Sequence, residues 1–201
     1  ISAILRPHQG VLSAITGHIS EHEAGAIEAT GHKVLVLPEV EGRISPQDVE
    51  AFVDNHYADA SFEHWVQPGM VYISNTTERG GTYSKAQLTA LSDTCKKLNL
   101  PLFIDGARLG YALAEEGTDL KFTDLPKLCD VFALGGTKQG ALFGEAIVVV
   151  NEQLKKDFRY IIKQKGGMLA KGWLLGLQFE ALLEGNRYLD LSAQANRLAT
   201  T

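Results

Sequence analysis

The stretch Leu102-Phe103-Ile104-Asp105-Gly106-Ala107-Arg108 carries the clearest information about the fold. It follows Pro101, and its first three residues are typical of a buried strand that closes at an acidic side chain. Gly106 then allows a tight turn, and a helix is predicted to open near Ala107. A strand that leads directly into a helix is the repeating unit of α/β proteins.

The same alternation of strands and helices continues on both sides of this stretch. Other short apolar runs predict strands at residues 11–15, 33–37, 70–74, 131–134 and 146–150. Helical patterns occur at residues 46–53 after a Ser45 cap, at 84–98 and at 172–183. We therefore predict an α/β fold whose mostly parallel sheet is flanked by helices on both faces. Ligands of such sheets bind where strands end and loops begin.

Composition and charge narrow the class of protein. With 201 residues, 45% of them hydrophobic, the chain can bury a full core. Its formal net charge of -5 offers no broad basic surface for nucleic acid or acidic membranes, which favours a small-molecule partner. No apolar run approaches the roughly 18 residues that span a bilayer. Cys95 and Cys129 form no CxxC pair, which favours the reducing cytoplasm.

The chain is predicted to contain one sheet domain and the beginning of a second part. Residues 1–165 would form the large α/β domain, and residues 166–201 a long, well-buried helix that leads toward a C-terminal small domain or a partner subunit. Residues 1–5 look like the apolar face of a helix already in progress. We therefore expect the chain to begin inside a larger protein.

Two side chains at strand ends have the chemistry of a cofactor site. A carboxylate in the position of Asp105 either caps the next helix or holds a pyridinium nitrogen protonated, so that the ring accepts electrons. Lys138 lies in the loop Gly135-Gly136-Thr137-Lys138-Gln139-Gly140. A lysine in such a loop is either exposed and inert or partly desolvated, with an amine free to react with an aldehyde. The spacing of the glycines excludes a phosphate-binding P-loop.

Two further polar clusters follow predicted strands. His18 and His22 are four residues apart, but there is no HExxH motif and no third ligand, so we predict no metal site. A loop histidine is either structural or a flat ring that stacks on a pyridine face and moves a proton. Asn75 begins the polar segment 75–79, which is either a simple turn or a group of cofactor and substrate ligands at the same rim.

In their order and spacing these motifs resemble the low-specificity L-threonine aldolases. The motifs are His18 with Glu23-Ala24-Gly25, then Ser74-Asn75-Thr76, then Asp105-Gly106-Ala107-Arg108, then Thr137-Lys138. The resemblance covers nearly the whole chain. It implies a fold-type I enzyme that depends on pyridoxal 5'-phosphate (PLP), with the large domain of aspartate aminotransferase, and it makes residues 1–165 the PLP-binding domain.

The resemblance also implies a reaction and a role for each residue. The reaction is the retro-aldol cleavage of L-threonine or L-allo-threonine to glycine and acetaldehyde, by a homodimer or homotetramer. Lys138 would be the Schiff-base lysine, Asp105 the partner of the pyridine nitrogen, and His18 the ring stacked on the cofactor. Asn75 would also contact the cofactor, and Arg108 would hold the substrate carboxylate, a task suited to a planar guanidinium.

The sequence departs from that family in several places. Many members have a histidine directly after the Asn-Thr pair, where this chain has Thr77. The base that removes the proton of the substrate's β-hydroxyl group could therefore be His18, His22 or a bound water molecule, and the sequence does not choose among them. The Gly-Gly-Thr phosphate loop expected before Ile1 and the small domain with a further arginine are missing. We expect the chain by itself to bind PLP weakly.

Two other functions are consistent with the same residues. A related fold-type I lyase acting by β-elimination on an aromatic or sulfur amino acid would use Lys138 and Asp105 and release ammonia and pyruvate. A non-catalytic binding or assembly domain would keep the α/β scaffold without a cofactor. A nucleotide-binding domain is disfavoured, because neither GxGxxG nor a Walker lysine follows a predicted strand.

Overall fold

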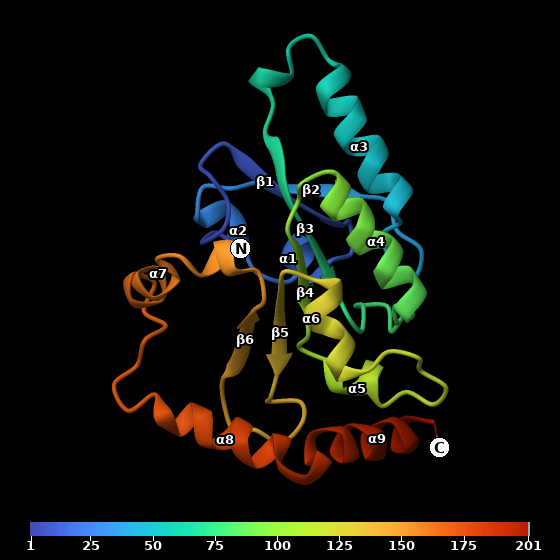
Figure 1. The fold of residues 1–201 in the computed structure, drawn as a ribbon, viewed down its shortest axis with the longest axis vertical. Helices are drawn as coiled ribbons and strands as arrows, with labels where there is room; N and C mark the ends of the chain where they lie inside the picture. Colours follow the sequence, from blue (N-terminus) through green and yellow to red (C-terminus); the bar gives the residue numbers. More distant parts are fainter. Residues whose placement is uncertain (201) are drawn as a thin grey trace.

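The computed structural model describes residues 1–200 and has a six-stranded sheet in the order β2-β1-β3-β4-β5-β6 at its centre (Figure 1). The strands are β1 (Gln9–Ala14), β2 (Val34–Leu37), β3 (Gln67–Ser74), β4 (Leu102–Asp105), β5 (Val131–Gly135) and β6 (Glu145–Val149). Strands β1 to β5 pair in parallel, whereas β6 runs antiparallel to β5. The predicted strands and the mostly parallel sheet are confirmed, and the reversed direction of β6 is new.

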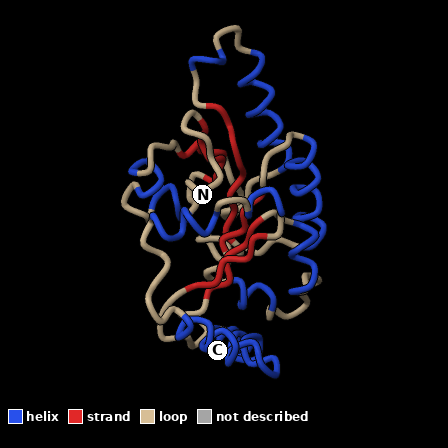
Figure 2. Tube along the Cα trace, turned by 60° about the vertical axis from the view of Figure 1, so that its left-hand side comes forward, coloured by secondary structure: helices blue, strands red, loops and turns tan. Residues whose placement is uncertain are grey.

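Helices lie on both sides of this sheet, as Figure 2 shows. They are α1 (His18–Glu21), α2 (Ala26–Ala29), α3 (Pro46–Ala58), α4 (Lys85–Lys97), α5 (Leu109–Leu113), α6 (Leu125–Leu128), α7 (Phe158–Gln164), α8 (Trp173–Leu183) and α9 (Arg187–Ala199). Short 3-10 helices are η1 (Phe62–His64), η2 (Phe122–Asp124), η3 (Glu152–Lys155) and η4 (Glu184–Asn186). None of the helices within residues 1–200 is long and apolar enough to cross a membrane.

Apolar side chains cover both faces of the sheet. Leu12 and Val71 belong to the larger core, which also contains residues of α3, α4 and α6. Their chain neighbours Val11 and Met70 belong to a smaller core that includes Ile19 of α1. Successive side chains of a strand point to opposite faces, so each of these strands contributes to both cores. Coverage of both faces is what a parallel sheet requires.

The first five residues differ from the prediction. They form a turn rather than a helix, in which the N–H groups of Ile4 and Leu5 donate to the carbonyl of Ile1 at 2.8 and 3.3 Å. Leu5 is buried in the smaller core, and Ile1 and Ile4 pack against it. The apolar spacing therefore reflects the burial of a turn beneath the sheet.

The segment predicted as one long helix at residues 166–201 contains two helices within its described part. Gly185, at φ 60°, lies in the break between α8 and α9. Phe179 and Leu182 are the buried residues of α8, whereas Trp173 is 61% and Leu177 is 50% exposed. Within residues 1–200 only one side of α8 packs on the sheet domain, and burial of its other side by a second domain or a partner subunit stays a prediction. The boundary between the two predicted domains stays a prediction.

The backbones that follow β4 and β5 approach each other closely. The N–H of Gly135 donates to the carbonyl of Gly106 at 3.0 Å. A Cβ atom on Gly106 would lie 2.0 Å from the carbonyl oxygen of Ala133, and one on Gly135 would lie 2.7 Å from the Cα of Ala107. Only residues without a side chain allow this contact, and it brings the two strand-end loops together.

We expect Gly106→Ala to lower the free energy of unfolding by about 1–3 kcal/mol, the usual cost of overpacking. The added methyl group meets backbone, which cannot move aside without separating β4 from β5. Urea unfolding of the full-length protein measures the effect. Gly176→Ala in α8 is the matched control, because its Cβ would meet nothing within 4 Å. Equal unfolding midpoints for the two variants would contradict the expectation.

Candidate active site

A cavity of about 200 Å³ lies at the edge of the sheet where β3, β4 and β5 end. Ser74 and Asp105, the last residues of β3 and β4, are register partners. The cavity is lined by His18, Glu23, Ser74, Thr76, Glu78, Asp105, Ala107, Arg108, Lys138 and Glu145. The structure thus brings four of the predicted site residues to one cavity: His18, Asp105, Arg108 and Lys138.

Asp105 is held by two hydrogen bonds at the end of β4. Its Oδ1 accepts from the N–H of Ala107 at 2.9 Å, and its Oδ2 accepts from the hydroxyl of Tyr72. Burial raises the pKa of Tyr72, and the charge of Asp105 raises it further, so the phenol stays protonated and donates. Tyr72 is itself stacked on Phe103, with 5.6 Å between ring centroids. The carboxylate therefore both caps the turn and lines the cavity with a fixed orientation.

Lys138 lines the cavity from the loop after β5. Its carbonyl accepts from the Tyr111 hydroxyl at 2.8 Å, and the preceding Gly135 carbonyl accepts from the Tyr188 hydroxyl at 3.0 Å. These bonds anchor the loop to α5 and α9. Of the two states that the sequence left open for Lys138, exposed or partly desolvated, the structure shows the exposed one, because most of the loop from Thr137 onward extends beyond the sheet into solvent. Among the described residues its amine makes no ion pair.

His18 is positioned by a neighbouring carboxylate. It is the first residue of α1, which follows β1 after a short loop, and its Nδ1 lies 2.7 Å from Oε1 of Glu23. This contact fixes the plane of the ring at the cavity wall. His22 lies one turn further on, with 5.4 Å between the two ring centroids, but it is exposed and does not line the cavity. Within residues 1–200, no group of three or more His, Cys, Asp or Glu side chains is arranged to hold a metal ion.

The two remaining predicted residues differ in their placement. Arg108 precedes α5, is partly buried and lines the cavity, and its guanidinium makes no ion pair within the described residues. Asn75 is fully buried and does not line the cavity. Its Oδ1 accepts from the N–H of Tyr83 at 3.3 Å, so the side chain turns toward the loop that leads into α4. Its Nδ2 is buried and has no hydrogen-bond partner among the described residues, and the contact between Asn75 and a cofactor stays a prediction.

Two carboxylates on the cavity wall were missed from the sequence. Glu145 is the first residue of β6, and the antiparallel register places it opposite Gly135, at the edge where the parallel strands end. The position of Glu145 at the cavity could have been predicted only if the direction of β6 had been known. Glu78 lies in the polar segment after β3, and its Oε1 accepts from the hydroxyl of Ser74 at 2.6 Å.

Glu145 provides a pH-dependent test of this geometry. Glu145 is exposed as a residue, but partial burial of its carboxylate raises the pKa above the ordinary 4.5, and the charge of Asp105 raises it further. The stabilising contribution of the protonated form is present below the ordinary pKa and is lost as pH rises through the raised value. We expect Glu145→Gln to unfold at a higher urea concentration than the wild type, by a margin that increases with pH across this range. A margin that stays constant with pH, as expected for the exposed control Glu63→Gln, would contradict the assignment.

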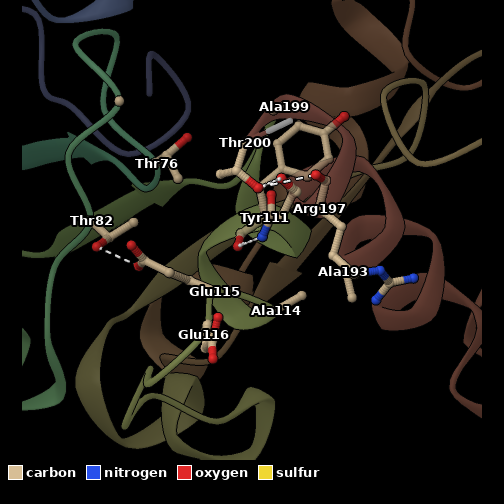
Figure 3. Close-up of a pocket in the computed structure, with 12 residues that line it drawn as sticks. Thr76, Thr82, Tyr111, Ala114, Glu115, Glu116, Ala193, Arg197, Ala199 and Thr200 are labelled. Atoms are coloured by element: carbon tan, nitrogen blue, oxygen red, sulfur yellow. Dashed lines mark hydrogen bonds between the residues drawn. The ribbon is translucent and has the colours of Figure 1, made fainter.

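A larger cavity of about 730 Å³ lies beside the first, between the loop after β3, α5 and α9 (Figure 3). Thr76 lines both cavities. Some of its polar side chains are engaged with each other or with backbone: Thr82 Oγ1 donates to Glu115 at 2.8 Å (Figure 3), and Asn196 donates to the carbonyl of Tyr111 at 3.0 Å. Its described lining contains no lysine. The smaller cavity is therefore the candidate active site.

Known proteins are similar to this chain in sequence and fold. The model of the beta-eliminating lyase family matches residues 1–200. A low specificity L-threonine aldolase from a Pseudomonas species is 33% identical over 201 residues, which is 99% of this chain and 57% of that relative. The structure of a threonine aldolase from Leishmania major matches with a TM-score of 0.94 and 47% identity, over 99% of this chain and 57% of that one. An aspartate aminotransferase mutant from Thermus thermophilus shares the fold alone, with a TM-score of 0.71 and 16% identity over 98% of this chain and 49% of that one.

Proposed function

The chain belongs to the beta-eliminating lyase family, and from this premise we propose that it is the cofactor-binding part of a PLP-dependent threonine aldolase. The resemblance predicted from the sequence and the fold-type I architecture are confirmed. The chain spans 57% of the curated Pseudomonas relative, so the activity is proposed for the full-length protein. The proposed reaction cleaves L-threonine or L-allo-threonine to glycine and acetaldehyde.

The observation that carries this proposal is the donor set of the small cavity. The amine of Lys138, the carboxylate of Asp105 and the imidazole of His18 line the same cavity. This set fits PLP: Lys138 would hold the aldehyde carbon, Asp105 the ring nitrogen, and His18 a face of the ring. When bound, PLP supplies an electron sink for a bond broken at the substrate's Cα. Asp105 suits its role because Tyr72 and Ala107 already orient its carboxylate.

The other wall residues would bind and orient the substrate. The guanidinium of Arg108 is partly buried and, in the described part of the chain, free of ion pairs, so it can bind a carboxylate through two parallel hydrogen bonds. His18 is held in place by Glu23, so its ring excludes water from one side of the site. The anchored loop around Lys138 keeps the amine facing the same space.

Product identity tests the proposed function. Full-length protein with PLP should release acetaldehyde and glycine from L-threonine. Pyruvate and ammonia from tyrosine, tryptophan or cysteine, without acetaldehyde from threonine, would instead favour the β-eliminating alternative. Failure to develop the yellow absorbance of bound PLP would favour a non-catalytic domain.

We also infer that the protein is a homodimer or homotetramer. Leu142 and Phe143 are exposed, and the N–H of Leu142 donates to Gln178 of α8 at 2.7 Å, next to the exposed Trp173 and Leu177. An exposed apolar surface of this kind is typical of a protein interface, and most oligomers are built from identical chains. Light scattering of the full-length protein should give the mass of two or four chains.

A cytoplasmic location is inferred from the cysteines. Cys95 and Cys129 are both buried and unpaired, and burial raises the pKa of each thiol to about 12. Thiols in this state suit a reducing compartment. Microscopy of the tagged full-length protein tests this inference. A small amino acid remains the expected partner, and we expect no binding of nucleic acid.

A further inference from the structure

Glu78 is a carboxylate on the cavity wall to which the chemistry described above gives no role. Ser74 donates a hydrogen bond to Oε1 of Glu78, and both residues line the cavity. The second oxygen, Oε2, is shielded from solvent and has no hydrogen-bond partner among the described residues. Buried polar atoms are nearly always paired, and an exception requires an explanation, such as catalysis or a bound ligand. A fixed carboxylate with one free oxygen is well suited to accept a proton.

The retro-aldol reaction proposed above requires such an acceptor. Cleavage of the bond between Cα and Cβ begins with loss of the proton from the β-hydroxyl group, whose oxygen then forms the carbonyl of the aldehyde. The electron pair of the broken bond goes to the Cα side, and a proton added there completes glycine. The net change moves one proton from oxygen to carbon, so no oxidant or reductant is needed.

Most other acid–base groups on the wall already have a partner or a role. Lys138 and Asp105 would hold the cofactor, and Arg108 would bind the substrate carboxylate. His18 is paired with Glu23 at 2.7 Å. Of these groups only His18 keeps an acceptor atom without a partner among the described residues, Nε2, and its proposed place against a face of the cofactor ring assigns it to stacking.

The hydroxyl of Thr77 is used by hydrogen bonds within the loops, and Thr77 does not line the cavity. It is buried, its hydroxyl donates to the carbonyl of Glu41 at 2.7 Å, and it accepts from the N–H of Gly81 at 2.9 Å. The next side chain along the polar segment, that of Glu78, lines the cavity instead. His22, one of the bases left open by the sequence, is exposed and outside the cavity wall.

Glu145 is the remaining competitor. Its carboxylate is influenced by Asp105 and Lys138, which places it beside the groups that would hold the cofactor. It is also exposed, and none of the hydrogen bonds described for the chain fixes its carboxylate. Glu78 is partly buried and oriented by Ser74, so it is the better-placed acceptor.

We propose that Glu78, oriented by Ser74, is the catalytic residue that accepts the proton of the substrate's β-hydroxyl group. This assignment rests on the proposed aldolase function. It replaces the three bases left open by the sequence with a residue in the same strand-end segment as Asn75 and Thr77.

The test compares two reactions of the full-length protein loaded with PLP. Glu78→Gln should lower turnover of L-threonine by about 10²- to 10⁴-fold, the usual contribution of a general base. Exchange of the Cα proton of glycine with deuterated water should continue at the wild-type rate, because glycine has no β-hydroxyl group. The absorbance of bound PLP should also match the wild type. Glu63→Gln, which removes an exposed carboxylate without a partner among the described residues, should leave both reactions unchanged.

Each other result overturns the assignment in a recognisable way. Wild-type turnover in Glu78→Gln would show that another group takes the proton, and a larger loss in Glu145→Gln would identify Glu145. An equal loss of threonine cleavage and glycine exchange, or loss of PLP absorbance, would assign Glu78 to cofactor binding or structure. A wild-type protein that exchanges glycine but cleaves no threonine would refute the aldolase function itself, and this assignment with it.

Discussion

Lys138→Ala is expected to abolish the borohydride-reducible adduct that the full-length protein forms with PLP and to lower turnover by more than about 10²-fold. The amine of Lys138 lines the cavity that also contains Asp105, and among the described residues it makes no ion pair. Covalent attachment of a carbonyl group requires such a free amine. Alanine removes the amine but leaves the loop, because Tyr111 bonds to the backbone carbonyl of residue 138.

Lys163→Ala is the matched control for this experiment. Lys163 is an exposed residue of α7 and does not line the cavity. Its variant should form the same adduct as the wild type, detected as a mass increase after borohydride reduction. If Lys138→Ala retained an identical adduct, the assignment of the lysine would be wrong, and peptide mapping would locate the true one.

The position of the site was predictable because strand ends are local features. The run at residues 102–105 and the run at 131–134 each showed an apolar strand followed by a polar loop. Parallel pairing then sends both loops to the same edge of the sheet. The structure has both loops at this edge, and Asp105 and Lys138 line one cavity.

Other parts of the site depend on relations that no local pattern contains. The run at residues 146–150 reads as a strand in either direction, and only its antiparallel pairing with β5 places Glu145 at the cavity. Asn75 follows β3 directly, but its side chain turns toward Tyr83 because the loop before α4 passes there. The exposed face of α8 looks like a core helix in the sequence, since apolar periodicity does not say whether the covering surface belongs to the same chain.

Asp105→Asn is expected to weaken PLP binding and lower turnover of threonine by about 10²- to 10³-fold, as loss of one partner of a shielded charge pair usually costs about 2–5 kcal/mol. The variant keeps the volume of the side chain but removes its negative charge. The amide has one accepting oxygen, whereas the N–H of Ala107 and the hydroxyl of Tyr72 now donate to separate oxygens, so the bond to Tyr72 is lost or reversed in direction. Titration with PLP, followed by absorbance, measures affinity independently of turnover.

Two companion variants separate the charge of Asp105 from its hydrogen bonds. Tyr72→Phe removes the hydroxyl that donates to Oδ2 but leaves the carboxylate charged, so its effect on PLP affinity should be smaller than that of Asp105→Asn. Asp54→Asn, at an exposed position of α3 away from the cavity, should have no effect. If Tyr72→Phe weakened PLP binding as much as Asp105→Asn, orientation rather than charge would explain the role of Asp105. Wild-type affinity and turnover in Asp105→Asn would mean that this carboxylate does not face the cofactor, and the geometry proposed for the site would fail with it.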